Sequence, residues 1–197
     1  MPLIIYCLAF TGGFVIMSLE LLGGRLLAPY FGSSIYVWGS IITVFMLSLA
    51  LGYLFGGRWS LNHPSMRRFS LIFLAAALLL TPLVYFSEEV MILIFERIED
   101  PRYGSLLAAS ALFIVPTIIL GMISPYSVRL LVSSTHTSGQ VAGFLYFVST
   151  MGSALGTLAT SFYFVLWWEM NTILFGLAGT LLAMSILAQI AGTGRRS

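Results

Sequence analysis

The sequence predicts an all-α polytopic membrane protein of about six transmembrane helices, in a single domain over residues 1–197. Three observations predict this fold class. Hydrophobic residues make up 59% of the chain, charged residues only 8%, and the mean hydropathy is +1.00. Soluble domains are about one-quarter charged, so this chain lacks the polar surface that water requires. Six apolar segments also meet or approach the roughly 20 residues that cross a hydrocarbon core.

Apolar stretches of this length are expected to be helices, because backbone polar groups find no partners in lipid. The expected spans are Pro2–Leu22, Ile35–Gly56, Phe69–Ser87, Gly104–Ile123, Gln140–Leu166 and Asn171–Ala191. The charged segment 88–103 lies between the third and fourth spans and has an apolar middle. It fits either a short amphipathic helix at the interface or an extension of the third helix past the membrane.

The distribution of arginine predicts the orientation. With six spans, both termini and the second and fourth loops share one side of the membrane. Most of the nine basic residues, all arginine, fall on that side: Arg58, Arg67, Arg68, Arg129, Arg195 and Arg196. Cytoplasmic loops carry an excess of basic residues, so both termini are expected to be cytoplasmic. The expected location is the plasma (inner) membrane of a prokaryote.

Composition argues against several function classes. The formal charge of +2 is small and scattered, so nucleic-acid binding is not expected. His63 and His136 have no second ligand at metal-binding spacing, so neither a metal nor another cofactor is expected. Asp100 is the only aspartate and lies in a predicted loop, which disfavours a hydrolytic triad. The single cysteine, Cys7, lies in an apolar run and is expected to be a small packing residue.

The sequence contains an internal repeat. Shifting the chain by 104 positions aligns two stretches without a gap. The matches include Arg25-Leu26-Leu27 with Arg129-Leu130-Leu131, Gly39 with Gly143, and Ala50-Leu51-Gly52 with Ala154-Leu155-Gly156. Each repeat, near residues 1–100 and 101–191, would contain three helices, an odd number, so the second copy must be inverted. Inverted three-plus-three repeats form each half of a major-facilitator transporter, and transporter sites lie near the midplane where repeats meet.

Glu20 is the leading candidate for a functional residue, with Arg25 beside it. A carboxylate at membrane depth is costly and usually faces a bundle interior or a cavity. One interpretation is a cation, proton or solute site. The other is that Glu20 lies at headgroup level and pairs with Arg25, although five positions is a poor spacing on one helix unless Gly23 and Gly24 break it.

Prolines and glycines are expected to shape the helices. Pro116 and Pro125 lie within and at the exit of the fourth span, where proline kinks a helix. Glycine pairs spaced by four let helix backbones approach closely. The glycines expected to pack in this way are Gly52, Gly56, Gly143, Gly152 and Gly156.

Two blocks of the sequence resemble the membrane domain of the membrane-bound, major-facilitator-like spermidine synthases. The first block comprises Gly13–Glu20, Arg25–Ser34 and Leu47–Arg58. The second comprises Pro116–Gly121, Ser124-Pro125, Arg129-Leu130, Gly139, Gly143–Tyr146, Ser149–Gly152 and Gly156. One departure is Ser149, where this family usually has asparagine, so an amide-specific role there is in doubt.

In that family a soluble domain carries out aminopropyl transfer. The longest non-membrane stretch here is on the order of fifteen residues, far below a typical domain, so the activity is not expected in this chain. The small size of the chain and the few polar residues within its spans favour a non-catalytic membrane subunit or scaffold, which docks with a separate synthase-like enzyme or a larger membrane complex. The alternative is a small transporter-like module, perhaps as a homodimer, that moves a cationic or small organic solute.

Overall fold

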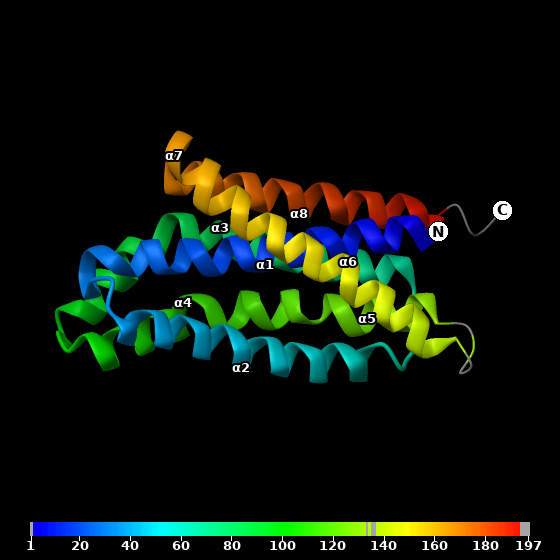
Figure 1. The fold of residues 1–197 in the computed structure, drawn as a ribbon, viewed down its shortest axis with the longest axis horizontal. Helices are drawn as coiled ribbons and strands as arrows, with labels where there is room; N and C mark the ends of the chain where they lie inside the picture. The colour runs from blue at the N-terminus through cyan, green and yellow to red at the C-terminus, as the bar shows by residue number, and fades with distance from the viewer. Residues whose placement is uncertain (1, 133, 135–136, 194–197) are drawn as a thin grey trace.

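The structure, a computed structural model, describes residues 2–132, 134 and 137–193, and every regular element in them is helical. Six helical rods are long and apolar enough to cross a membrane (Figure 1). Four rods are single helices: α1 (Pro2–Phe31), α2 (Ile35–Trp59), α3 (Met66–Phe95) and α8 (Met170–Thr193). The fourth rod is α4 (Pro101–Gly121) plus α5 (Ile123–Leu131), and the fifth is α6 (Ser138–Ala159), the π-helix η1 (Thr160–Phe164) and α7 (Val165–Trp167).

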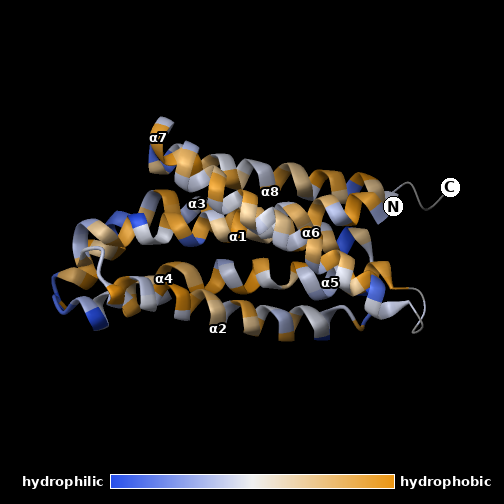
Figure 2. Ribbon diagram, in the orientation of Figure 1, coloured by the Kyte–Doolittle hydropathy of each residue, from blue (hydrophilic) through white to orange (hydrophobic). Residues whose placement is uncertain are grey.

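The predicted fold class is confirmed: this is an all-helical integral membrane protein with six helices of spanning length. Figure 2 shows hydrophobic residues along the length of the rods and the most hydrophilic residues mainly near their ends. This distribution is what a bilayer solvent selects. The first residues of α1 and the last turns of α8 lie at the same end of the bundle (Figure 1), as an even number of crossings requires.

Two helices extend beyond their predicted ends. α1 continues through Gly23 and Gly24 to Phe31, so the glycines do not break it. Both lie under aromatic rings, because a Cβ on Gly24 would lie 2.6 Å from Trp38 and one on Gly23 3.1 Å from Phe113. α3 continues to Phe95, so of the two interpretations of segment 88–103, the structure shows an extended third helix.

The internal repeat is visible in how the helices cross. The most extensive contacts pair α1 with α6, α2 with α4, and α3 with α8. A Cβ on Gly156 would lie 2.4 Å from the carbonyl oxygen of Phe14, and one on Gly52 would lie 2.3 Å from that of Ile118. Gly52 and Gly156 are 104 positions apart, and so are Phe14 and Ile118. The offset of 104 residues found in the sequence therefore relates the α1–α6 crossing to the α2–α4 crossing.

A second pair of contacts follows the same offset one turn further along. A Cβ on Gly56 would lie 2.7 Å from the Cα of Met122. At the positions 104 residues away, Thr160 donates a 2.8 Å hydrogen bond to Ser18. α1 and α4 run in opposite directions (Figure 1), so the two halves are related as an inverted three-plus-three repeat.

The fourth rod is interrupted between α4 and α5, at Met122. Proline has no backbone N–H, and its ring collides with the carbonyl four residues earlier. For Pro125 that carbonyl belongs to Gly121, the last residue of α4. Pro125 therefore accounts for the break, whereas Pro116 lies inside an α4 that continues past it.

Candidate functional site

Glu20 lies on the side of α1 that is turned toward α2. Residues four and seven apart share a helix face. Gly24, four positions on, packs under Trp38 of α2. At this level α6 and η1 contact the opposite side of α1, where Ser18 bonds to Gly156 and Thr160. Glu20 is therefore on the α2 side of α1, away from its contact with α6.

The depth and the environment of Glu20 are unusual for a carboxylate. It is about 5 Å along the axis from the midpoint of α1, at 1.5 Å per residue, and its side chain is half-buried. No hydrogen bond or ion pair joins it to any residue that the structure describes. A charged group at this depth normally pairs with an opposite charge or faces water. Glu20 is therefore an unpaired carboxylate within the described part of the chain.

Arg25 is not that partner. The guanidinium Nη1 of Arg25 donates a 3.0 Å hydrogen bond to the carbonyl oxygen of Val165, at the start of α7. The only ion pair within the described part of the chain joins Arg102 to Asp100. The two predicted site residues therefore share a helix, but the structure does not bring them together.

Polar and irregular features of α4 lie at the same level as Glu20. Gly12 packs on Ile123 and Gly23 on Phe113, which fixes the antiparallel register of α1 against the fourth rod. In this register Glu20 is level with Pro116 and Thr117. The hydroxyl of Thr117 is buried and has no hydrogen-bond partner among the described residues. Sequence analysis had singled out Glu20 and Pro116 but had missed Thr117, which reads as an ordinary membrane residue.

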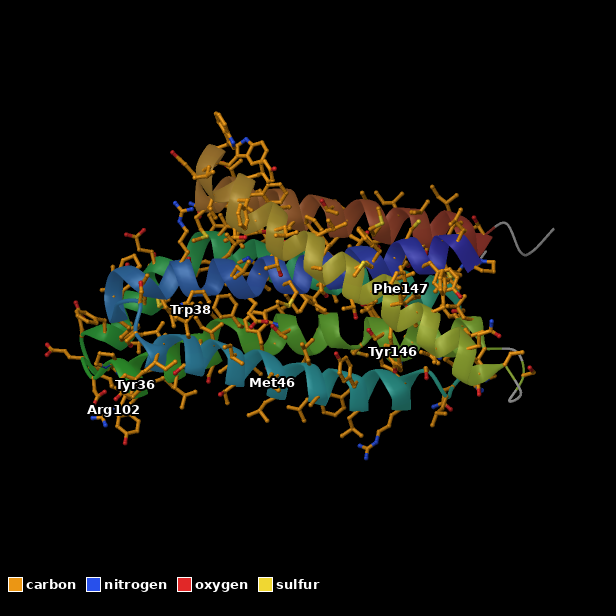
Figure 3. All side chains as sticks on the ribbon, in the orientation of Figure 1. Tyr36, Trp38, Met46, Arg102, Tyr146 and Phe147 are labelled. Atoms are coloured by element: carbon orange, nitrogen blue, oxygen red, sulfur yellow. The ribbon has the colours of Figure 1, made fainter. Side chains whose placement is uncertain are left out.

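The outer surfaces of α2 and α6 form what we call the α2–α6 face. It comprises Gly39 and Met46 of α2 with Gly143, Tyr146 and Phe147 of α6, all of them exposed. Figure 3 shows the side chains of Met46, Tyr146 and Phe147. In the fifth rod, only 17% of the most apolar stretch is buried inside the protein, against 39–50% in the other five rods. The fifth rod is therefore the least covered span.

The predicted packing glycines divide into two groups. Gly52 and Gly56 pack on α4–α5, and Gly152 and Gly156 pack on α1. Gly143 is different, because a Cβ added there would meet no atom within 4 Å, and the same holds for Gly39, its equivalent on α2. These two glycines leave helix backbone open on the α2–α6 face.

A small polar cluster joins the loop after α3 to the start of α2. The backbone N–H of Arg102 donates to the Asp100 carboxylate at 2.9 Å, so Asp100 caps α4. The side-chain and backbone hydrogen bonds from Arg102 lower the pKa of Asp100 below its ordinary value. The guanidinium also lies 5.8 Å from the centre of the Tyr36 ring, and Figure 3 shows the two side chains together.

No group of three metal-ligating side chains occurs among the residues that the structure describes. His63 lies in the loop after α2 with a positive φ of 48°. His136 and the terminal arginines Arg195 and Arg196 lie outside the described residues.

Comparisons with known proteins gave no match: no family model, no curated protein and no solved structure resembles this chain significantly.

Proposed function

We propose that this protein is a non-catalytic integral membrane subunit or scaffold, and that the α2–α6 face docks against a partner protein. The observation that carries the proposal is the low burial of the fifth rod, 17% in its most apolar stretch. A span of a six-helix bundle that contributes so little to its own core has most of its surface available to another protein.

The glycines of the α2–α6 face support this proposal. Small residues are enriched where transmembrane helices approach each other closely. Gly52, Gly56, Gly152 and Gly156 are all used in this way within the protein. Gly39 and Gly143 stand at equivalent positions of the two repeats, and neither has a neighbour within 4 Å of a Cβ position. A helix from a partner could approach the backbone at both places.

Glu20 adds a reason for the partner to be a protein rather than lipid alone. The carboxylate lies on the α2 side of α1 and has no partner in the described chain. Lipid tails cannot hydrogen-bond to it, whereas a docked helix can supply an arginine, lysine, hydroxyl or amide group.

The resemblance to the membrane domain of spermidine-synthase-like proteins suggests the class of partner. A separate synthase-like enzyme or a larger membrane complex is our first choice, with a homodimer as the remaining possibility. We propose a plasma-membrane (inner-membrane) location in a prokaryote, with both termini cytoplasmic. The arginines of the second loop, Arg67 and Arg68, would then face the cytoplasm.

Gentle-detergent purification of the native protein, followed by mass spectrometry, tests this proposal with a matched pair of variants. Gly143→Trp fills the open position on α6, and Gly179→Trp adds the same bulk to α8, where a Cβ also meets no atom within 4 Å. A stoichiometric partner that is lost with Gly143→Trp but retained with Gly179→Trp supports the proposal. Retention by both variants, or no partner of the wild type, contradicts it.

A transporter-like module is the second candidate, because Glu20, Pro116 and Thr117 lie at one level where the repeats meet. Transporter sites of inverted-repeat proteins occur at such places. In liposomes, Glu20→Gln should then abolish uptake of a cationic solute while the protein still assembles. Unchanged uptake would remove Glu20 as a cation site.

A further inference from the structure

A groove of about 530 Å³ lies on a different side of the protein from the α2–α6 face, between α1, α8 and the η1–α7 segment. Phe10 and Phe14 of α1, Phe164 of η1, and Trp168 form one part of its wall. Gly176 and Thr180 of α8 form the other part. Its volume is within the range of about 300–1,000 Å³ that is typical of ligand sites.

The lining of this groove is suited to a hydrocarbon chain. The Phe14 and Phe164 rings are 6.1 Å apart and the Phe164 and Trp168 rings 5.5 Å apart, which makes a continuous aromatic wall. The hydroxyls of Thr11 and Thr180 donate to carbonyls of their own helices, at 2.9 Å and 2.8 Å. The donor hydrogens of these hydroxyls are therefore already used, and Thr172 is the one further hydroxyl in the groove lining within the described chain.

The length of the groove matches one leaflet of a bilayer. From Thr172 to Thr180, the groove residues of α8, the helix advances by about 12 Å at 1.5 Å per residue. Half of a hydrocarbon core is about 15 Å. Trp168 lies at the α7 end, where an interfacial aromatic residue is expected, and Thr180 lies near the middle of the bundle.

A cationic group is present at the α7 end of the groove. Arg25 donates to the carbonyl oxygen of Val165 at 3.0 Å, and Val165 directly follows the groove residue Phe164. A guanidinium has five N–H donors, so others remain for an anion. Glu88 lines a neighbouring pocket with Arg25, but no carboxylate lies within 4.0 Å of Arg25 in the described part of the chain.

We infer that this groove holds one acyl chain of an anionic phospholipid, whose phosphate group binds Arg25. Arginine forms forked hydrogen bonds with phosphate, and the aromatic wall covers the chain below it. The π-helix η1 gives this wall its shape, and π-helical turns are frequent at functional sites. The lipid belongs to the leaflet that contains the Arg25 end of α1.

The inference can be tested with the purified full-length protein in liposomes that contain a phosphatidylglycerol with a photoreactive acyl chain. Peptide mass spectrometry should locate the cross-links on residues of the groove. Native mass spectrometry should show phosphatidylglycerol retained in preference to phosphatidylcholine. Arg25→Gln should reduce this preference about tenfold, the effect of losing one charge-assisted hydrogen bond. Arg129→Gln, the same change at the equivalent exposed position, should leave it unchanged.

A second pair of variants tests the acyl chain separately from the phosphate. Gly176→Phe fills the groove, whereas Gly57→Phe adds the same ring to α2, which does not line the groove, and neither Cβ position has an atom within 4 Å. Gly176→Phe should abolish the groove cross-links and Gly57→Phe should not; Gly176→Leu provides a smaller filling if the phenylalanine variant does not fold. Equal labelling in all variants overturns the inference. So does an effect confined to Arg25 or confined to Gly176, because the proposed site requires both.

Discussion

The two halves of the protein make equivalent crossings but differ in the continuity of their helices. In the first half, α1 is an unbroken helix from Pro2 to Phe31, and α2 is α-helical from Ile35 to Trp59. In the second half, the equivalent of α1 is broken at Met122 and the equivalent of α2 changes to a π-helix at Thr160. The crossings, at Gly52 on Ile118 and Gly156 on Phe14, are nevertheless the same.

This difference separates the features that define the repeat fold from the features that occur in only one half. The glycine crossings occur in both halves, so they define the inverted repeat. Each irregularity occurs in one half only and positions a particular side chain. The break at Met122 is followed by Tyr126, which is fully buried against Phe69. The π-helix brings Phe164 to the groove beside Arg25.

The largest effect is expected at the two crossings. Gly52→Leu and Gly156→Leu each force a side chain into a backbone carbonyl, and each should cost about 4 kcal/mol or more of the free energy of unfolding. Chemical denaturation in detergent measures this. Gly179→Leu, in open space, should change the free energy of unfolding by less than about 0.5 kcal/mol. A large loss at only one crossing would contradict the equivalence of the two halves.

The next effect is expected at Tyr126, which has no aromatic counterpart in the first half because the equivalent residue is Leu22. Its ring stacks on Phe69 with centroids 5.4 Å apart, and its hydroxyl accepts a 3.1 Å hydrogen bond from the Ser65 N–H. Tyr126→Ala should cost about 3 kcal/mol through the cavity that it leaves. Tyr126→Phe should cost about 1 kcal/mol through the lost hydrogen bond. The same denaturation experiment measures both variants. Equal losses of unfolding free energy for Tyr126→Ala and Tyr126→Phe would contradict a stabilising role of the ring.

A smaller loss of stability is expected at the contact one turn beyond each glycine crossing, where the two halves differ. Thr160 donates to Ser18 at 2.8 Å, whereas the equivalent Gly56 has no side chain. Thr160→Val keeps the shape but removes the hydrogen bond, and should cost about 1 kcal/mol in thermal or chemical unfolding. Thr180→Val is the matched control, because that hydroxyl bonds only to its own helix. A greater loss for Thr180→Val would refute this assignment.

The smallest effect is expected at Asp100, which is exposed and lies outside the crossings. Its pKa is lowered in the folded protein, so the folded state binds a proton less readily than the unfolded state. The resulting stabilisation is present above the ordinary pKa of aspartate and is lost as the pH falls through the lowered value. Asp100→Asn should slightly lower the melting temperature at neutral pH and show less further loss in acid. An unchanged acid response would argue against the Asp100–Arg102 contact.

Hydropathy and the lengths of the apolar segments were sufficient to predict the six spans. In lipid every backbone polar group must be hydrogen-bonded within the protein, so a long apolar segment forms a helix. The offset of 104 was also visible in the sequence, since glycines at a close crossing cannot be replaced by larger residues. The end of α1 was not predicted, and the sequence left the end of α3 open between two interpretations. Gly23 and Gly24 suggest a break until the rings of Phe113 and Trp38 are known to cover them.

The candidate site was predictable only in part. Glu20 stands out as a carboxylate in an apolar run, but its lack of a partner depends on how the neighbouring helices pack around α1. Arg25 could be recognised as a cation near the end of a span, whereas its bond to Val165 requires the tertiary structure. The π-helix at Thr160 gave no sequence signal, because Thr-Ser-Phe-Tyr-Phe is compatible with an ordinary α-helix.

Site-specific photo-cross-linking in native membranes tests the central claim, that the α2–α6 face docks a partner protein, most directly. Photoreactive benzoylphenylalanine would replace Phe147 on this face or, as the control, Ile186 on α8; their side chains are 59% and 54% exposed. The account predicts a discrete protein adduct from position 147 and none from position 186. No protein adduct from position 147, or the same adducts from both positions, would contradict it.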